Sequence, residues 1–455
     1  MAHIVFAAPG VDRFHLHDRL QRELVRRQHR VTVLGLDAAT AAFYTQQGLP
    51  TVGAEWTGAG QDGDDPGAPL AEFAAIDQRR GGRSSARRQR RLQRTAAWLR
   101  RWFDAHRVDL VLLHQQRDAD HALLHFLARE HGCRVLWTGE GLLPHTLQLD
   151  ERGLDGDASA SRRRVMDYRV VRAEPPLLAA ALTHTLGGSA PFALTPRAVA
   201  LPPLQQRLAA LRASWREGGL DSVVAAWRTF RGAARPAAAP APDTPLPFAL
   251  PAAPFVSVLL QPGNDDRRRL DADDAPQDAA LVAAAARAAR ALDPELRLVI
   301  VAAHPQRARS PQVRHIDGTE CVRVSASAAA TAAATGLATI TVNHPAASVA
   351  LLAGTPVLHL GAALYGLPGV TTRSHLEALP TDLARAISHD HPTLRQRFLT
   401  WLFGHGHVWC SATRPDHNGL CGLVQAIEAR LGRPAGEPPL RYRSGPAWPL
   451  AADRA

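Results

Sequence analysis

The sequence predicts an α/β protein of two domains joined by a helical and Pro-rich connection. In two separate parts of the chain, apolar runs of strand length alternate with amphipathic helical segments, the pattern of a parallel sheet. The 455 residues exceed the usual size of one domain, and a hydrophobic share of 46% is enough for two cores. The expected segments are an N-terminal domain at 1–165, the connection at 166–250, a C-terminal domain at 251–380, and helices with a tail at 381–455.

The N-terminal part repeats a strand, helix, strand unit. Each copy has two apolar runs separated by a helical segment, and the second copy leads into a Gly-rich loop. The segments are HIVFAAPG, DRLQRELVRRQH and RVTVLGL, followed by VDLVLLHQ, HALLHFLAREHG and CRVLWTGEG. Since parallel strands need crossovers of this kind, we expect a doubly wound sheet here.

The pattern then becomes helical before a second strand and helix alternation begins. The helical segments are LLAAALTHTL, LQQRLAALRASWREG and VVAAWRTFRG, and the linker is ARPAAAPAPDTPLPFALPAAP. Prolines at this density cannot continue a helix or enter a central strand. The second set comprises FVSVLLQPG, an alanine-rich helix after Asp278, LRLVIVAAHP, LATITVNHP and TPVLHLG, and closes near Leu379. Both domains are therefore expected to be Rossmann-like.

Charge and cysteine content bound the class of protein. All 53 basic residues are arginine and the formal charge is +11, which indicates an acidic partner without choosing among nucleic acid, an anionic membrane surface and a phosphorylated substrate. The four cysteines lie far apart without C-x-x-C spacing. This argues against a zinc site and a disulfide framework, and favours a reducing cytoplasm.

Neither export nor membrane spanning is predicted. The first apolar run is too short for a signal peptide and no basic region precedes it. The 49 residues 324–372 contain no Asp, Glu or Arg, but Gly336, Asn343, Pro345, Gly354 and Pro356 break them into pieces shorter than a bilayer span. We expect buried helix, strand, loop and helix there.

The segment from Arg79 to Arg101 holds ten arginines and no acid. From Ser85 it is compatible with a helix, and Leu92, Trp98, Leu99 and Trp102 supply apolar side chains beside the arginines. Three interpretations are open: a solvated basic helix facing its own core, adsorption to an anionic membrane, and binding of nucleic acid. The last is disfavoured because no recognition motif accompanies the charge.

The stretch TGEGLLPHTLQLDERGLDGDAS places Glu140 between two glycines at the end of an apolar strand. Carboxylates at such strand ends are often catalytic in doubly wound domains, because ligands bind beyond the carboxyl ends of the strands. A local role, in which Glu140 caps or pairs within a surface loop, is the alternative.

Several segments resemble, in the same order, the capsular polysaccharide synthesis proteins that act as β-Kdo transferases, a family related in motif to bacterial CMP-sialyltransferases. The matching segments are HQQRDADHALLHFLAREHG, GEGLLPHTLQLDERGLDGDAS, the QPG at Gln261, the His-Pro at His304, and VNHPAASVALLAGTPVLHLGAALYGLPGVTT. The resemblance runs from the first strand to about Thr372. It implies the two-domain architecture of the glycosyltransferase B class, with residues 1–165 on the acceptor side and residues 251–380 binding the nucleotide sugar. It also implies transfer of a sugar acid, Kdo in this family, from a CMP-activated donor.

The resemblance also implies roles for individual residues. Glu140 takes the place of the acidic residue that acts as catalytic base in the related sialyltransferases. Whether it is the base in a β-Kdo transferase depends on whether configuration is retained, and two-carboxylate chemistry then asks for a second acid, with Asp118, Asp155 and Asp157 as candidates. The implied substrate-binding residues are Arg117, His121, Gln261, His304, Asn343, His344, Ser348 and Tyr365. For each of these, packing or a local hydrogen bond is the alternative role. The amides of Ala346, Ala347 and Ser348 are expected to form an anion site at a helix start.

The sequence departs from the family pattern at four places. Gly139 precedes Glu140 where the family has a second acid, Ala302 stands in place of a lysine, His344 in place of a small hydroxyl residue, and Gly153-Leu154-Asp155 in place of Gly-Val-Asn. A catalytically silent relative that binds capsule precursor or an export complex is therefore the alternative to an active transferase.

The family resemblance and the arginine-rich segment also give expectations for cofactors, partners and location. No metal or other cofactor is expected, because a CMP donor has no diphosphate for a metal to bridge, although the DGD from Asp155 to Asp157 is a formal D-x-D match. The expected partners are the nucleotide-sugar donor, a lipid-linked or oligosaccharide acceptor, an anionic membrane surface contacted by Arg79 to Arg101, and a capsule export complex, with no nucleic acid. The expected location is the cytoplasm, peripheral to the inner membrane.

Overall fold

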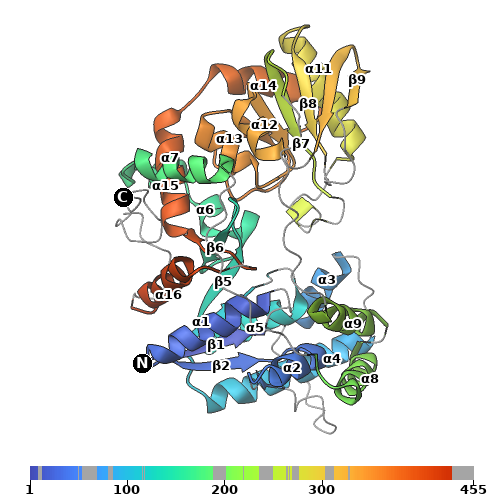
Figure 1. Ribbon diagram of the computed structural model, residues 1–455, viewed down its shortest axis with the longest axis vertical. Coiled ribbons are helices and arrows are strands. Elements are labelled where there is room, and N and C mark those ends of the chain that lie inside the picture. The colour runs from blue at the N-terminus through green and yellow to red at the C-terminus, as the bar shows by residue number, and fades with distance from the viewer. Residues whose placement is uncertain are drawn as a thin grey trace.

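The chain folds around two seven-stranded sheets, one in the lower and one in the upper half of the view in Figure 1. The computed structural model describes residues 1–8, 13–49, 51–53, 69–79, 86–114, 116, 118–187, 201–218, 220–234, 250–262, 265, 267–268, 276–302, 312–325, 328–413 and 415–432. Helices cover both faces of each sheet, which is the layered arrangement of doubly wound domains. The predicted two-domain α/β fold is confirmed.

The first sheet is parallel except for β6. Its order is β14-β6-β5-β4-β1-β2-β3, with β6 antiparallel to both of its neighbours. The strands are β1 (His3–Ala7), β2 (Arg30–Leu34), β3 (Thr51–Val52), β4 (Leu110–Leu113), β5 (Arg134–Glu140), β6 (Thr146–Asp150) and β14 (His407–Trp409). The central strands β1 and β4 are entirely buried, as their continuous apolar runs predict for strands covered on both faces.

Two helical layers sandwich this sheet. The helices are α1 (Phe14–Arg26), α2 (Ala38–Gln46), α3 (Leu70–Arg79), α4 (Ala86–Ala105) and α5 (Ala119–Glu130). Side chains of α1 share one core cluster with alternate residues of β1 and β4, whereas those of α3, α4 and α5 share a second cluster with the remaining residues of the same strands. The alternation along each strand thus sends successive side chains to opposite layers.

The second sheet has the order β13-β12-β11-β7-β8-β10-β9 and is parallel except for the edge strand β9. Its strands are β7 (Phe255–Leu259), β8 (Arg297–Val301), β9 (Gln312–Ile316), β10 (Thr319–Val324), β11 (Ala338–Thr341), β12 (Val357–His359) and β13 (Thr372–Arg373). The helices α11 (Asp278–Leu292) and α14 (Leu379–Ser388) cover one face, and α12 (Ala329–Thr335) and α13 (Ala347–Ala353) cover the other.

The remaining helices connect the two halves or lie against the first one. They are η3 (Asp155–Asp157), α6 (Ser159–Arg162), η4 (Val165–Val170), α7 (Pro175–Leu186), α8 (Leu204–Gly218), α9 (Leu220–Ala234) and α15 (Pro392–His405). Tyr168 packs edge-on against Phe398 and Trp401, so η4 and α15 share a core with α7 and α13. By contrast, α8 and α9 pack on α2.

The C-terminal part of the chain returns to the first domain. After α15, β14 pairs with β6, and α16 (His417–Leu431) packs on α1 (Figure 1). Leu423, Val424 and Ile427 of α16 lie in one buried cluster with Leu20 and Leu24 of α1. The sequence pattern did not predict this return, which makes β14 part of the N-terminal sheet and α16 part of the layer of helices on it.

The apolar stretch 324–372 forms the predicted helix, strand, loop and helix in α12, β11 and α13, followed by β12. No helix in the described part of the chain is long and apolar enough to cross a membrane.

Ile427→Ala tests the C-terminal return. Ile427 is fully buried against α1, so its truncation should lower the free energy of unfolding by about 2 to 5 kcal/mol, as for other large-to-small core changes. Urea unfolding followed by circular dichroism measures this loss. Leu292→Ala, at a 37% exposed position at the end of α11, is the matched control and should cost less than about 1 kcal/mol. Equal losses in the two variants would show that α16 does not belong to the core.

Candidate functional site

Each sheet has one point at which the strand order reverses direction. In the first sheet this point lies between β1 and β4, and in the second it lies between β7 and β11. Ligands of open α/β sheets bind beyond the carboxyl ends of the strands at such points. Gln261 and Asn343 follow β7 and β11, and His114 follows β4, so these residues mark the two places where a site is expected.

Gln261 and Asn343 bind each other across the reversal point of the second sheet. The Gln261 Nε2 donates to Asn343 Oδ1 at 2.9 Å, and the Asn343 backbone amide donates to Gln261 Oε1 at 3.1 Å. Asn343 Nδ2 donates to the carbonyls of Arg267 at 2.8 Å and Ala362 at 3.1 Å. Both side chains are buried, and their amide groups hold the loop that carries Arg267 instead of facing a ligand.

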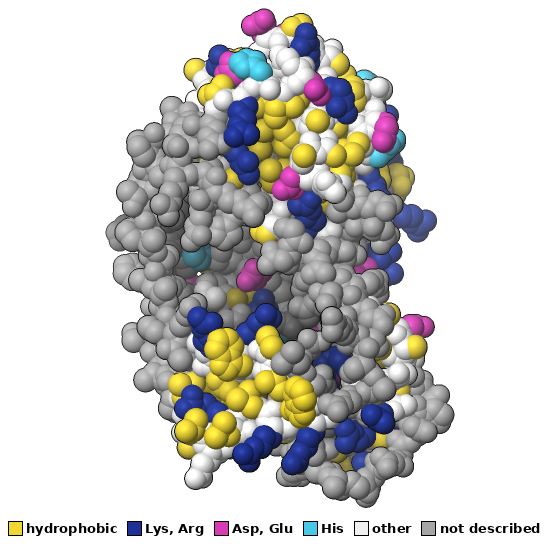
Figure 2. Space-filling view, turned by 90° about the vertical axis from the view of Figure 1, so that its right-hand side faces the viewer, with side chains coloured by type: hydrophobic (Ala, Val, Ile, Leu, Met, Phe, Trp, Pro, Cys, Tyr) yellow, Lys and Arg dark blue, Asp and Glu magenta, His cyan; other side chains and the backbone are white. Residues whose placement is uncertain are grey.

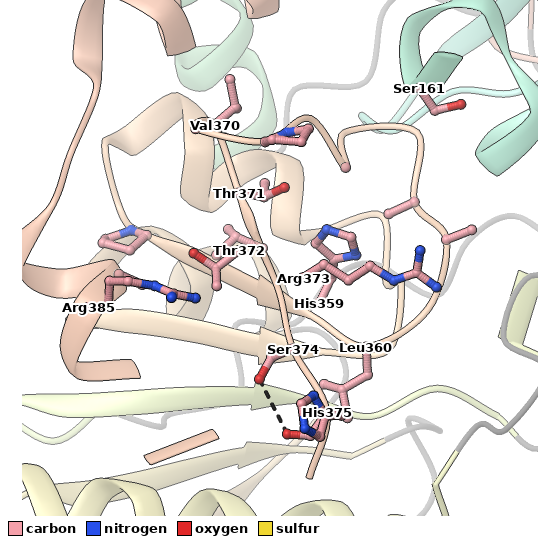
Figure 3. Close-up of a pocket in the computed structure, with 18 of the residues that line it drawn as sticks. Ser161, His359, Leu360, Val370, Thr371, Thr372, Arg373, Ser374, His375 and Arg385 are labelled. Atoms are coloured by element: carbon pink, nitrogen blue, oxygen red, sulfur yellow. Dashed lines mark hydrogen bonds between the residues drawn. The ribbon is translucent and has the colours of Figure 1, made fainter. Parts of the chain in front are cut away.

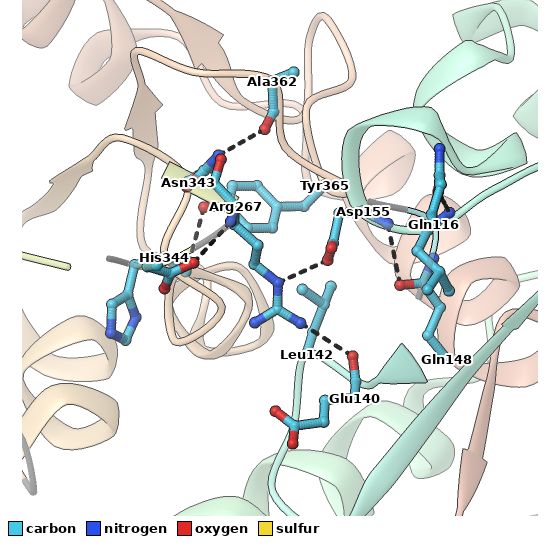
Figure 4. A network of polar contacts seen from close by, with 12 residues as sticks. Gln116, Glu140, Leu142, Gln148, Asp155, Arg267, Asn343, His344, Ala362 and Tyr365 are labelled. Atoms are coloured by element: carbon cyan, nitrogen blue, oxygen red, sulfur yellow. Dashed lines mark hydrogen bonds and ion pairs between the residues drawn. The ribbon is translucent and has the colours of Figure 1, made fainter. Parts of the chain in front are cut away.

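Arg267 reaches from this loop to the first domain (Figure 4). Its Nε donates to Asp155 Oδ1 at 2.8 Å, and its Nη2 donates to the backbone carbonyl of Glu140 at 3.1 Å. Burial opposes the charge, but Asp155, Asp265 and Glu140 outweigh it and hold the pKa of Arg267 above its usual value. The guanidinium is therefore a permanent cation at the contact between the domains.

Glu140 lies beside this cation with its carboxylate directed away from the network (Figure 4). Its side chain is 67% exposed, and Arg13 Nη2 lies 3.9 Å from its Oε1. The Arg13 side chain is only 16% exposed, so a partly buried second cation flanks the carboxylate. The Glu140 carboxylate is therefore exposed to solvent and has the Arg13 guanidinium beside it. In this position a ligand can contact it.

The backbone after Glu140 is held by the returning C-terminal segment. The amide of Leu142 donates to His407 Nε2 at 3.2 Å, while His407 Nδ1 lies 3.1 Å from the carbonyl of Leu402. A Cβ on Gly141 would come within 2.0 Å of Thr146 Oγ1 and 2.9 Å of the His407 ring. Only glycine fits there, and β14 therefore shapes the turn that presents Glu140.

Asp150 organises the Gly-rich loop that follows β6. It accepts hydrogen bonds from the amides of Arg152, Gly153 and Ser159 and from the Ser159 hydroxyl, at 2.7 to 3.1 Å. Its carboxyl group is buried, and this burial raises its pKa despite the four donors. The loop places Asp155 in the left-handed region at a φ of 51°, which Asp tolerates better than most residues.

The three candidates for a second acid are all engaged by other groups. Asp118 is the N-cap of α5 and accepts from the amides of Asp120 at 3.0 Å and His121 at 3.3 Å. Asp155 pairs with Arg267. Asp157 pairs with Arg162 at 2.7 Å and accepts from Gln116 Nε2 at 2.8 Å. Each therefore has a structural role in this arrangement.

The expected anion site at the start of α13 is not present. The amide of Ala346 donates to His344 Nδ1, and those of Ala347 and Ser348 donate to the carbonyls of His344 and Pro345, at 3.0 to 3.1 Å. These three amides bond to acceptors within the turn that precedes α13, so they are not available to a phosphate. Burial lowers the pKa of His344 to about 4, which leaves its ring neutral.

Ser348 and Tyr365 are buried and bonded within the protein. Ser348 Oγ donates to the carbonyl of Pro345 at 2.8 Å and lies 3.4 Å from that of Leu142, across the domain contact. Tyr365 donates to the carbonyl of His344 at 2.9 Å. These side chains support the loop that carries Asn343 and do not face solvent. Arg117 and His304 lie outside the described residues.

His17, His114 and His121 gather at the reversal point of the first sheet. The rings of His17 and His114 meet edge to face at 4.2 Å, and His114 Nδ1 bonds the Thr138 hydroxyl. His121 Nδ1 lies 3.2 Å from Asp118 Oδ1. Burial and the charge of Arg13 lower the pKa of His17 to about 3, and burial, His17 and Arg13 lower that of His114 well below its usual value.

Figure 3 shows residues that line a cavity of about 1640 Å³. Gly156, Asp157 and Arg162 line it from the first domain, and the 359–377 loop and α14 line it from the second. Its basic lining residues include His359, Arg373, His375 and Arg385. Ala362 belongs both to this lining and to the network, since its carbonyl accepts from Asn343. The cavity therefore opens between the two domains.

Three arginines of the site were missed by sequence reasoning. Arg13 and Arg267 flank Glu140, and Arg373 lines the cavity. Arg267 lies in the polar run NDDRRR directly after the QPG motif, and Arg13 lies after the first strand. Their positions after strand ends are the signal that would have identified them. Within the described residues, no group of three His, Cys, Asp or Glu side chains is placed to hold a metal ion.

No protein-family model matches the chain, and no curated protein matches it. Among solved structures, the β-Kdo 2,4 transferase KpsC of Thermosulfurimonas dismutans has 13% identity and a TM-score of 0.36 over 70% of this chain and 87% of that chain. S. aureus MnaA in complex with UDP has 11% identity and a TM-score of 0.33 over 96% and 99%. Spinosyn rhamnosyltransferase SpnG with spinosyn aglycone has 15% identity and a TM-score of 0.31 over 88% and 95%. These values are too low to transfer an activity.

The buried histidines predict that the protein loses stability in mild acid. His17 and His407 have pKa values of about 3 and about 4 in the folded protein, against 6.5 for an ordinary histidine. Between pH 6.5 and about 4 the unfolded chain binds protons that the folded chain cannot, so the free energy of unfolding falls as pH falls. Each such histidine contributes up to about 2 kcal/mol between pH 6.5 and 5.

Urea unfolding at several pH values measures the slope of unfolding free energy against pH. His17→Gln should reduce that slope over pH 5 to 6.5 by about one proton. His315→Gln, at an exposed position of β9, is the matched control and should leave it unchanged. A parent protein whose stability is flat over this range would contradict the prediction.

Proposed function

We propose that the protein is a glycosyltransferase that moves a sugar acid, Kdo by the resemblance, from a CMP-activated donor to a lipid-linked or saccharide acceptor. One observation carries the proposal: Glu140 is an exposed carboxylate at a strand end where the two domains meet, with Arg13 and Arg267 beside it. A carboxylate next to fixed cations suits a reaction in which a hydroxyl loses a proton while an anionic leaving group departs.

The chemistry assigned to these residues is a substitution at the anomeric carbon. Glu140 accepts the proton of the acceptor hydroxyl, whose oxygen forms the new bond to that carbon. The bond from the carbon to the phosphate oxygen breaks, and CMP leaves with the electron pair. Arg13 and Arg267 carry the positive charge near the phosphate and the sugar carboxylate. No metal is required in this scheme.

The cavity beside Asp157 is the proposed place for the part of the acceptor that lies away from the reacting hydroxyl, because Glu140, Arg13 and Arg267 are not among the residues that line it. It is larger than the range of about 300 to 1,000 Å³ that encloses most small ligands, so an oligosaccharide fits better than a single sugar. A cytoplasmic location at the inner membrane and contact with a capsule export complex remain part of the proposal, on the family resemblance alone.

A catalytically silent relative is the second candidate. It is favoured by the engagement of Asp118, Asp155 and Asp157, the three candidates for a second acid, in ion pairs. Binding of CMP without release of CMP from any CMP-sugar would support this candidate.

Glu140→Gln tests the assignment of the base. The amide keeps the size of the side chain but cannot accept the proton, so CMP release from the correct CMP-sugar should fall by about 100-fold or more. The thermal midpoint and the dissociation constant for CMP should change little, because the side chain is exposed. Glu295→Gln, at an exposed turn before β8, is the control and should keep the parent rate.

His304→Ala tests the proposed contact of His304 with the nucleotide phosphate. A charge-assisted contact to phosphate contributes about 1.5 to 3 kcal/mol, so this variant should bind CMP about 10- to 100-fold more weakly.

The Glu140→Gln variant can contradict the proposed mechanism. If it releases CMP at the parent rate, the Glu140 carboxylate is only a loop residue and the mechanism fails.

A further inference from the structure

Large apolar side chains lie exposed on α8 and α9, at the side of the first domain. Figure 2 shows hydrophobic side chains gathered over the lower part of this face with arginines among and around them. The exposed fractions are 61% for Leu204, 45% for Leu208, 51% for Trp215, 36% for Val224 and 49% for Trp227. We call these five residues the α8–α9 surface. Two exposed tryptophans on neighbouring helices are unusual unless the surface meets a partner.

Helical spacing places the α8–α9 surface on the outer sides of both helices. Leu204, Leu208 and Trp215 recur at intervals of four and seven along α8, and Val224 and Trp227 are three apart on α9. The opposite sides are occupied, because Ala210, Ala226 and Phe230 are buried against Ala39 of α2. The helices therefore already have their packing partner, and the exposed apolar stripe is additional to it.

Arginines outnumber acids on these two helices. Arg212, Arg216, Arg228 and Arg231 are exposed, and the sequence of α8 and α9 contains two acids, Glu217 and Asp221. The Arg231 guanidinium lies 4.9 Å from the centre of the Trp227 ring, so the cation and the aromatic ring lie side by side on the exposed surface of α9. Tryptophan and arginine side by side are typical of segments that lie in the interface of an anionic membrane.

The Arg79 to Arg101 segment cannot supply apolar contacts of this kind. Leu92 and Leu99 are fully buried, Trp102 is 8% exposed, and Trp98 packs on the same core. Arg91 is buried and paired with Asp120, and Arg100 pairs with Glu130. The apolar side of α4 thus faces its own domain, as one of the three sequence interpretations held. Its exposed arginines add only charge near α8, which α4 contacts.

We propose that the α8–α9 surface docks the protein on an anionic lipid membrane, with Trp215, Trp227 and the leucines in the headgroup region and the arginines against lipid phosphates. The positive charge favours a negatively charged surface. The exposed apolar side chains favour a lipid surface, because they can insert into its headgroup region. Docking through this surface does not depend on glycosyl transfer, so it stands or falls separately from the proposed function.

Sedimentation of the purified full chain with vesicles tests the proposal. The protein should bind vesicles of phosphatidylcholine mixed with phosphatidylglycerol, bind phosphatidylcholine alone at least 10-fold more weakly, and lose affinity as salt rises. Brominated lipids should quench part of the tryptophan emission on binding, and this quenching should fall when Trp215 and Trp227 are replaced.

Two pairs of variants separate the apolar and the charged contributions. Trp215→Ser with Trp227→Ser should weaken binding to the mixed vesicles by about 10-fold or more. Arg216→Gln with Arg228→Gln should weaken it by about fivefold per arginine and flatten the salt dependence. Val313→Ser with Arg314→Gln, at exposed positions of β9, is the matched control and should bind as the parent does.

Circular dichroism and the thermal midpoint establish that each variant is folded, since all the changed positions are exposed. Binding that is equal on neutral and mixed vesicles, or unchanged in both variant pairs, would overturn the proposal. A concentration-dependent dimer in light scattering that the tryptophan variant abolishes, with no vesicle binding, would assign the surface to a second copy of the chain instead.

Discussion

The contact of Arg267 with the first domain is the interaction on which the rest of the site depends. One guanidinium from the loop after β7 donates to Asp155 and to the Glu140 carbonyl, and thereby joins segments that follow interior strands of two separate sheets. A buried cation is stable only when it is paired, and here the Gln261 and Asn343 pair fixes the loop so that the pairing is maintained. The backbone of Glu140 is thus bound while its carboxylate stays in solvent.

The path of the chain reinforces this contact. It leaves the first domain after the Gly-rich loop and comes back through α15 to β14 and α16, so the C-terminal part of the molecule completes the N-terminal sheet. His407 of β14 then supports the turn at Gly141 and Leu142. Elements more than 260 residues apart in the sequence therefore shape one turn, and the position of Glu140 is a property of both ends of the chain.

Local pattern was sufficient for the strands that are clear apolar runs, β1, β2, β4, β5, β7, β8, β11 and β12, and for the position of Glu140 at the end of β5. The strands β3, β6, β9, β10 and β13 were not predicted. The function of Asp118 as an N-cap was also visible in principle, since Asp directly precedes a helical apolar pattern. The hydrogen bonds of Gln261, Asn343 and Tyr365 could not be predicted, because the partners described above lie 19 to 82 residues away. The three-residue β14 is too short to carry a periodic signal, so the return to the first sheet is determined by tertiary packing.

The ion pair of Arg267 with Asp155 joins the two domains. A double-mutant cycle of Arg267→Met, Asp155→Asn and the two changes together, measured by urea unfolding at neutral pH, tests this role. We expect a coupling free energy of at least about 1.5 kcal/mol, because each single change leaves a largely buried polar partner without its ion pair. Effects that add within about 0.3 to 0.5 kcal/mol would show that the two side chains do not hold the domains together.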